Sequence, residues 1–216
     1  LADEDKQLSA KELENLILKK NNYKLRWDKE ICEGASLSDI DDKTINLFVK
    51  LAKESKRIII AGESKEMVLQ KLKLMNGDKV TNAGILVFGK NPSHFFDNIT
   101  LKCGRFKGLT EEFAYIKDMD GNLFQLLDGV LEFFKNYLSV RATIKEFRRE
   151  EKWEIPLEAI LNALIHRDYR PNSFVYVRIY DDLIDISNPG KLPEDIKIKD
   201  LYQKHKSEQR NPLIAN

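Results

Sequence analysis

The stretch from Glu154 to Arg170, EIPLEAILNALIHRDYR, constrains the fold of this chain more than any other part. Pro156 suits the first position of a helix, where its missing N–H costs nothing, and Leu, Ile and Ala dominate the residues that follow. At about 100° per residue, Glu158, Asn162 and His166 follow one another within an arc of roughly 80°. The sequence therefore predicts a helix from Pro156 to His166 with one polar stripe on an otherwise apolar surface that is buried on most sides.

Each residue of this stripe also has a purely structural interpretation. Glu158 near the helix N-terminus gains about 0.3–1 kcal/mol from the helix dipole, and His166 gains similarly near the C-terminus. Asn162 could be a hydrogen-bonded amide in the core. Leaving even one such group buried and unpaired costs about 1–3 kcal/mol, so the stripe requires either internal partners, such as Arg167, Asp168 or backbone, or a ligand.

The chemical interpretation of the stripe is a nucleotide site. A glutamate can orient or deprotonate a water, while an asparagine oxygen one turn later can ligate a Mg²⁺ ion that bridges phosphates. The spacing E-x-x-x-N on one helix supplies both groups from the same face. Glu158 is then the candidate catalytic residue, and Asn162 the candidate metal ligand.

The E-x-x-x-N pattern resembles the N-box of the GHKL (Bergerat-fold) ATPases, and three longer strings make the resemblance more specific. They are NALIHRDY at 162–169, YDDLIDISNPGKLP at 180–193 and RNPL at 210–213. Together with TNAGILVFG at 81–89, they look like a divergent branch, the GHKL-like domain of prokaryotic proteins described as transcriptional regulators or as ATP-dependent DNA helicase-related. Such proteins usually also carry an Alba/Schlafen-type DNA-binding domain.

This resemblance implies ATP and Mg²⁺ as cofactors and extends the list of candidate contacts. Asn188 stands nearest to the aspartate that accepts a hydrogen bond from the adenine amino group in GHKL enzymes, and Gly190 follows it, where backbone approaches the base. An asparagine oxygen can still accept this bond, but without the charge that strengthens it. His166 and Asp168 complete the candidate cofactor-binding set.

Composition excludes few classes of protein. The 216 residues are 42% hydrophobic and 33% charged with a net charge of +1, and no long basic run predicts a nucleic-acid surface, so we expect DNA contacts through domains outside this chain. Cys32 and Cys103 are far apart and fit free thiols in a reducing cytoplasm. No stretch predicts a membrane span or signal peptide. The first residue, Leu1, and the end at Asn216 suggest an excised fragment.

The predicted fold class is α/β, with a helical N-terminal part followed by an α/β two-layer sandwich, an incomplete Bergerat-type fold. We expect a helical or connecting segment at 1–75, for which a winged helix is the alternative, and a GHKL-like domain at 76–216, truncated at its C-terminal end. We expect one helix that begins near Ser9 and another that begins at Ser38 or Asp41. Further helices are expected at 67–74, 122–138 and 156–166. A last helix is expected after Leu192, where the family has a lid-like region. Expected strands are a central one at 85–89 and others at 104–108, 140–149, 174–180 and 183–187, the last two forming a hairpin.

Two functions follow from these expectations. The first is an ATP- and Mg²⁺-binding module of a transcriptional regulator, with weak ATPase activity in the longer protein and binding without turnover in this fragment. The second is a degenerate, non-catalytic copy of the fold that serves dimerisation, as in a homodimer, or contacts between domains.

Overall fold

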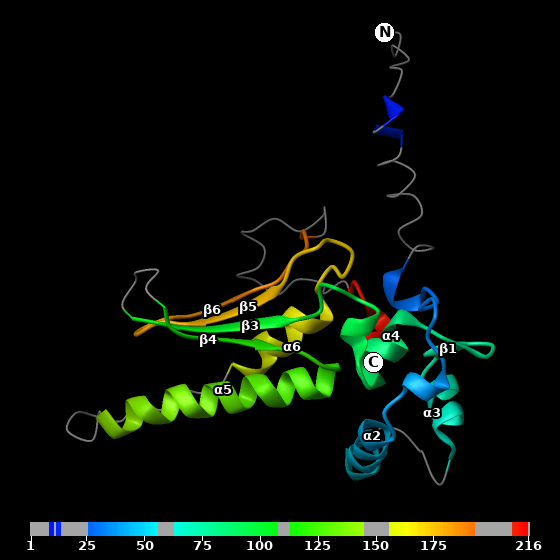
Figure 1. Cartoon of the computed structure of the whole chain (residues 1–216), viewed down its shortest axis with the longest axis horizontal. Coiled ribbons are helices and arrows are strands. Elements are labelled where there is room, and N and C mark those ends of the chain that lie inside the picture. Colours follow the sequence, from blue (N-terminus) through cyan, green and yellow to red (C-terminus); the bar gives the residue numbers. More distant parts are fainter. Residues whose placement is uncertain are drawn as a thin grey trace.

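The computed structural model describes residues 9–10, 12–13, 26–55, 63–107, 113–144, 156–192 and 209–215. Within these residues, a mixed four-stranded sheet carries two helices on one face, and a helical part lies beside one end of that sheet (Figure 1). This arrangement confirms the predicted α/β class with a helical N-terminal part. No helix among the described residues is both long and apolar enough to cross a membrane.

The large sheet has the strand order β4-β3-β5-β6. Its strands are β3 (Leu101–Phe106), β4 (Phe113–Met119), β5 (Val175–Ile179) and β6 (Ile184–Ser187). The central strands β3 and β5 are parallel, whereas β4 and β6 pair antiparallel at the two edges. The predicted hairpin of β5 and β6 is confirmed: the backbone N–H of Tyr180 donates to the carbonyl of Leu183 across the Asp181–Asp182 turn, at 2.8 Å.

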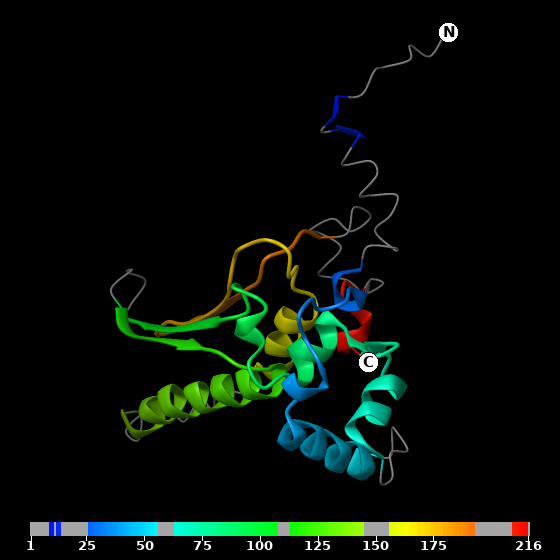
Figure 2. The ribbon, with the colours of Figure 1, turned by 45° about the vertical axis from the view of Figure 1, so that its right-hand side comes forward.

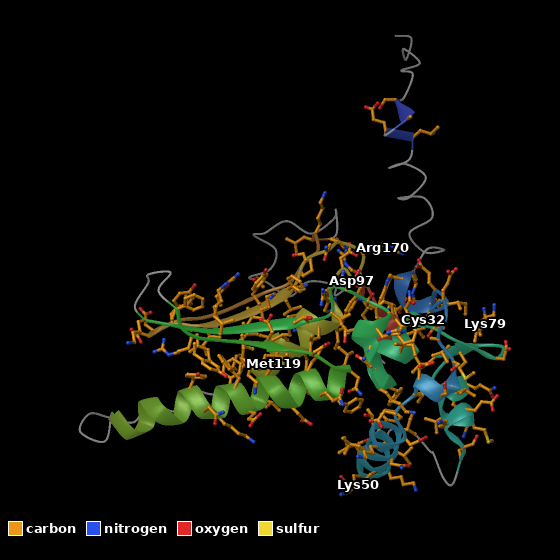
Figure 3. The ribbon with its side chains drawn as sticks, in the orientation of Figure 1. Cys32, Lys50, Lys79, Asp97, Met119 and Arg170 are labelled. Atoms are coloured by element: carbon orange, nitrogen blue, oxygen red, sulfur yellow. The ribbon has the colours of Figure 1, made fainter. Side chains whose placement is uncertain are left out.

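Helices α5 (Leu123–Ile144) and α6 (Leu157–Ile165) cover one face of this sheet (Figure 1). The core between the sheet and these helices is apolar. Met119 lies between β4 and α5 in Figure 3. The fully buried side chains of this core include those of Leu101, Val130, Phe134 and Val177. The helix predicted at 122–138 is confirmed and continues to Ile144. The strand predicted at 140–149 is therefore wrong over 140–144, since no Gly or Pro interrupts the helix there, and 145–149 lie outside the described residues.

The helical part contains short elements around a second apolar core. They are η1 (Trp27–Lys29), η2 (Leu37–Asp39), α2 (Asp42–Ser55), α3 (Lys65–Lys71), the hairpin of β1 (Met75–Asn76) and β2 (Lys79–Val80), α4 (Asn82–Phe88), η3 (Pro92–His94) and α7 (Pro212–Ala215). Asp41 begins α2, its carboxylate accepting from the Thr44 hydroxyl at 2.6 Å. Figure 2 shows α2 and α3 meeting at a corner, away from the sheet. The helix expected near Asp41 is thus confirmed. The helix expected at 67–74 is present but spans Lys65–Lys71, so it begins and ends earlier than expected. The Ser9–Glu12 capping box is also present.

The strand predicted at 85–89 is wrong, because residues 85–88 belong to helix α4 (Asn82–Phe88) and Gly89 follows its end. Thr81 begins the helix: its hydroxyl accepts from the Gly84 N–H at 3.2 Å and donates to the Leu74 carbonyl at 3.0 Å. The run is apolar on all sides because α4 is buried on all sides. A Cβ on Gly84 would lie 2.7 Å from a methyl of Val80, so the glycine allows α4 to touch the β1–β2 hairpin.

An aromatic contact joins the helical part to the sheet layer. The Trp27 ring of η1 stacks on Tyr169, which follows α6, with ring centroids 4.6 Å apart and an interplanar angle of 14°. Leu86 and Ile99 are buried in the same apolar cluster as these two rings. The second core also draws on residues before and after position 75, including Ile45, Val68 and Phe88. The domain boundary expected at 75/76 stays a prediction.

Candidate functional site

Helix α6 presents the predicted stripe on its outer surface. Pro156 lies one position before the first helical residue, and His166 ends the helix, its N–H donating to the Asn162 carbonyl at 2.9 Å. Glu158 and Asn162 are exposed and His166 is half-buried. Within the described ranges, no other side chain or backbone group forms a hydrogen bond or ion pair with these three side chains. The stripe therefore faces outward instead of being sealed by internal partners.

The apolar residues of α6 divide between the core and the surface. Ile160, Ala163 and Leu164 are buried against the sheet. Leu157 and Leu161, however, retain 43% and 36% of their surface exposed, so the expectation that the helix is buried on most sides is wrong. The outer surface of α6 consequently combines two leucines with a carboxylate and an amide, a mixture that suits a ligand with both apolar and polar parts.

The segment after α6 meets the Asn188–Pro189–Gly190 turn. The backbone N–H of Asp168 donates to the Pro189 carbonyl at 2.8 Å, which places the turn that follows β6 against the end of α6. Gly190 has a φ of +148°, a conformation that side-chain-bearing residues rarely adopt. Asn188 is exposed, and its amide donates to the adjacent Pro189 carbonyl at 3.4 Å. Asp168 and Gly190 are thus brought together, with Asn188 beside them.

Arg210 completes this corner. Its guanidinium donates to the Asp168 carboxylate at 2.8 Å and to the Lys191 carbonyl at 2.7 Å. A Cβ on Gly190 would lie 3.6 Å from the guanidinium carbon, so Arg210 lies directly against the glycine. The sequence marks Arg210 as part of the RNPL string, but gives no indication that it reaches across to Asp168.

Arg167 has a structural role instead of pairing with the stripe. It is 1% exposed, and its guanidinium donates to the carbonyls of Asn98 and, at 2.6 Å, Ser173, while it lies 4.9 Å from the centre of the Tyr169 ring. Burial lowers the pKa of this guanidinium from its ordinary value. Arg167 therefore holds the loop after α6 against residues 98–99, which precede strand β3.

Asn211 closes the C-terminal end of α6. Its side-chain amide is buried and donates to the carbonyls of Ile165 and Arg167, each at 2.8 Å. Two residues later, the Leu213 N–H donates at 2.8 Å to the carboxylate of Asp28, which is fully buried. Sequence reasoning missed Asn211 and Asp28, since their partners are separated from them by 44 and 185 positions.

The groups available for a cofactor are oxygen donors. Glu158 and Asn162 offer a carboxylate and an amide one turn apart, a donor set suited to Mg²⁺, whereas the described residues contain no cluster of three or more His, Cys, Asp or Glu that could hold a metal. A hollow of about 390 Å³ lies elsewhere, in the helical part. It is lined by Ile31, Cys32, Glu33, Gly34, Ala35 and Lys79.

Two family models match parts of the chain. Residues 172–216 match the family described as "Putative ATP-dependent DNA helicase recG C-terminal", and residues 16–101 match a domain of unknown function, DUF8451. The first match includes β5, β6, the Asn188–Gly190 turn and α7, so the similarity to this helicase-related family is confined to these elements. Glu158, Asn162, His166 and Asp168 precede it. No curated protein matches the chain significantly.

The fold has a counterpart among solved structures. It is similar to the crystal structure of the DIP2311 protein from Corynebacterium diphtheriae, with a TM-score of 0.61 and 19% sequence identity. The similarity covers 88% of this chain and 32% of that protein, so the chain spans about a third of that protein's length. At this identity the likeness concerns the fold alone.

Proposed function

We propose that this chain contains a GHKL-like nucleotide-binding module of a transcriptional regulator, and that it binds ATP with Mg²⁺ at the outer surface of α6. The observation that carries the proposal is the pair Glu158 and Asn162, one helical turn apart and exposed, with no other described group bonded to their side chains. The helicase-related match over 172–216 supports it, because that segment supplies the turn packed against the end of α6.

Each proposed contact follows from its chemistry. The Asn162 amide oxygen ligates Mg²⁺, and the Glu158 carboxylate orients a water and can accept its proton. Mg²⁺, when bound, neutralises phosphate charge. The Asn188 oxygen accepts from the adenine amino group, while Gly190 lets backbone approach the base; His166 and Asp168 lie between these groups along the chain. We propose binding as the function of this chain and weak turnover as a property of the longer protein.

A thermal-shift titration tests this proposal. A ligand that binds only the native state stabilises it by RT ln(1 + [L]/Kd), about 2.7 kcal/mol at a hundred times Kd. We expect a small rise in Tm with Mg-ATP over Mg²⁺ alone, lost in Glu158→Ala and in Asn162→Ala. Glu54→Ala, which removes an exposed helical glutamate of α2, is the matched control and should keep the rise.

Asn188→Asp sharpens the same experiment. Restoring a carboxylate opposite the adenine amino group strengthens that hydrogen bond, so the Tm rise should increase for ATP but not for inorganic triphosphate. A rise that survives both Glu158→Ala and Asn162→Ala would remove the site from α6. Absence of any rise at millimolar Mg-ATP, in Asn188→Asp as in the parent sequence, would refute nucleotide binding.

One observation favours the second function, a non-catalytic scaffold for dimerisation or contacts between domains. The Arg210 guanidinium lies against Gly190 and pairs with Asp168, in the corner proposed for the base. If Arg210 only stabilises a scaffold, Arg210→Ala lowers Tm equally with and without Mg-ATP. If it stands in the way of a base, the same variant shows a larger Mg-ATP shift than the parent protein.

A further inference from the structure

The sheet face opposite α5 and α6 carries a regular set of aromatic and cationic side chains. In the run FVYVRIY, residues 174–180, Val175, Val177 and Ile179 are buried in the core beneath β5. Because successive side chains of a strand point to opposite faces, the alternate residues project away from both helices. These residues are Phe174, Tyr176, Arg178 and Tyr180. Figure 1 shows no described helix on that face.

Strand β3 adds to this surface, because it is paired in register with β5. Lys102 lies opposite Tyr176, and its ammonium is 4.7 Å from the centre of the Phe174 ring. Arg178 lies with its guanidinium carbon 4.5 Å from the centre of the Tyr176 ring. At the far end of the strands, Phe106 stacks on Tyr180 with centroids 5.0 Å apart and an interplanar angle of 22°.

Gly104 shapes this surface. It occupies the outward position between Lys102 and Phe106, and a Cβ there would lie 2.7 Å from the Phe106 ring. The glycine therefore lets the ring lie down over the sheet. We define the aromatic face as Lys102, Phe174, Tyr176, Arg178 and Tyr180; Phe106, which is 7% exposed, packs against Tyr180 and supports it. Apart from Phe174 and Tyr180, which directly flank β5, these residues lie on the two central strands.

We propose that the aromatic face binds single-stranded nucleic acid. Unpaired bases stack on aromatic side chains whatever their sequence, and a four-stranded sheet whose central strands present aromatic rings is a known solution for this task. The cations are held against rings, where they complement phosphates beside the stacked bases. Tyr176 and Tyr180 lie roughly 13 Å apart along the strand, room for more than one base.

Two acidic residues on the edge strands neutralise the cations, and this sets the expected strength of binding. Lys102 pairs with Asp118 at 2.8 Å and Arg178 with Asp185 at 2.6 Å, all four side chains at least 30% exposed. Such pairs contribute little, so a phosphate can replace the carboxylate. With two phosphate contacts the log–log salt slope is about −1.4, so Kd rises roughly sevenfold between 50 and 200 mM salt.

This surface is independent of the proposed nucleotide site, because α6 packs on the opposite face of the sheet. The sequence gives only a weak indication of this surface because its cations are far apart in the chain. One comes from each central strand, and they form no basic run. A duplex, whose bases are already stacked on one another, offers no free base surface to these rings.

Fluorescence anisotropy with the whole chain tests the proposal. The probes are fluorescein-labelled dT10, rU10 and a ten-base-pair duplex at about 50 mM salt; comparing dT10 with rU10 separates DNA from RNA as the source of the strand. We expect both single strands to bind and the duplex to bind more weakly. Tyr176→Ala should raise Kd about fivefold or more, and Tyr176→Phe should restore binding.

Tyr115→Ala is the matched control. Tyr115 is a 46% exposed tyrosine of the same sheet, but it faces α5, where it stacks with Phe133 at 6.4 Å. Kd values unchanged by Tyr176→Ala, or changed equally by Tyr115→Ala, would overturn the proposal, as would equal binding of duplex and single strands. Absence of binding together with Tyr176-dependent self-association in sedimentation would identify a protein interface instead and also overturn it.

Discussion

The buried amide of Asn211 gives the sharpest stability prediction for this protein. In Asn211→Ala the carbonyls of Ile165 and Arg167 each lose a 2.8 Å hydrogen bond. The bond to Arg167 is fully buried, so its loss costs about 1–3 kcal/mol, whereas water can reach the partly buried Ile165 carbonyl and limits that loss to about 0.5–1.5 kcal/mol. We therefore expect a decrease of about 2–4 kcal/mol in the free energy of unfolding.

Urea unfolding followed by circular dichroism measures this decrease. With a slope of 1–3 kcal/mol per molar urea, the midpoint should fall by on the order of 1 M. Asn211→Asp keeps the shape but replaces the donor with an oxygen, so it should be at least as destabilising as the alanine. Asn188→Ala, which removes an exposed asparagine, should change the midpoint little. An Asn211→Asp midpoint equal to that of the parent protein would refute the assignment of these bonds as stabilising.

Three further predictions concern single side chains. Burial raises the pKa of Cys103 to about 12 and that of Cys32 to about 11, so both thiols stay protonated at pH 8. They should react with Ellman's reagent only after unfolding, and a rapid reaction of the native protein would contradict this. The hydrogen bond from Thr44 lowers the pKa of the Asp41 carboxyl, so its stabilisation is present above the unfolded value of about 3.9 and lost as pH falls through the folded value. Asp41→Asn should therefore destabilise at pH 7 and do so progressively less as the pH is lowered below about 4, and an effect that stays equal across this range would refute the linkage. Gly84→Ala should cost about 1–3 kcal/mol in urea unfolding because its Cβ would meet Val80 and the Leu74 carbonyl, and a neutral result would show that α4 can move away.

Long periodic patterns and helix-terminal residues predicted α2, α5, α6 and the β5–β6 hairpin, whereas β4 and the β1–β2 hairpin were not predicted. The Leu-rich spacing located α5, the alternation on either side of Asp181–Asp182 located the β5–β6 hairpin, and Asp41 marked the start of α2. These features succeed because local geometry alone determines them. The short apolar run in α4 failed because a fully buried helix and a fully buried strand look alike over so few residues.

The candidate site was only partly accessible to sequence reasoning. The four-residue spacing of Glu158 and Asn162 was sufficient to predict a shared face, since helical geometry fixes it. The contacts of Arg210 with Asp168 and of Asn211 with the end of α6 bring together positions more than forty residues apart. No local pattern encodes such pairs.

The hydrogen bonds that residues 210–213 make with α6 and Asp28 have a practical consequence for the design of truncated versions of the protein. A version ending at residue 208 would keep every strand of the sheet, yet it would remove the amide that caps α6 and the N–H that Asp28 accepts. Its sheet layer and helical part would each lose a tether at the same time. A shorter expressible fragment should therefore retain the RNPL string, however peripheral it looks in the printed sequence.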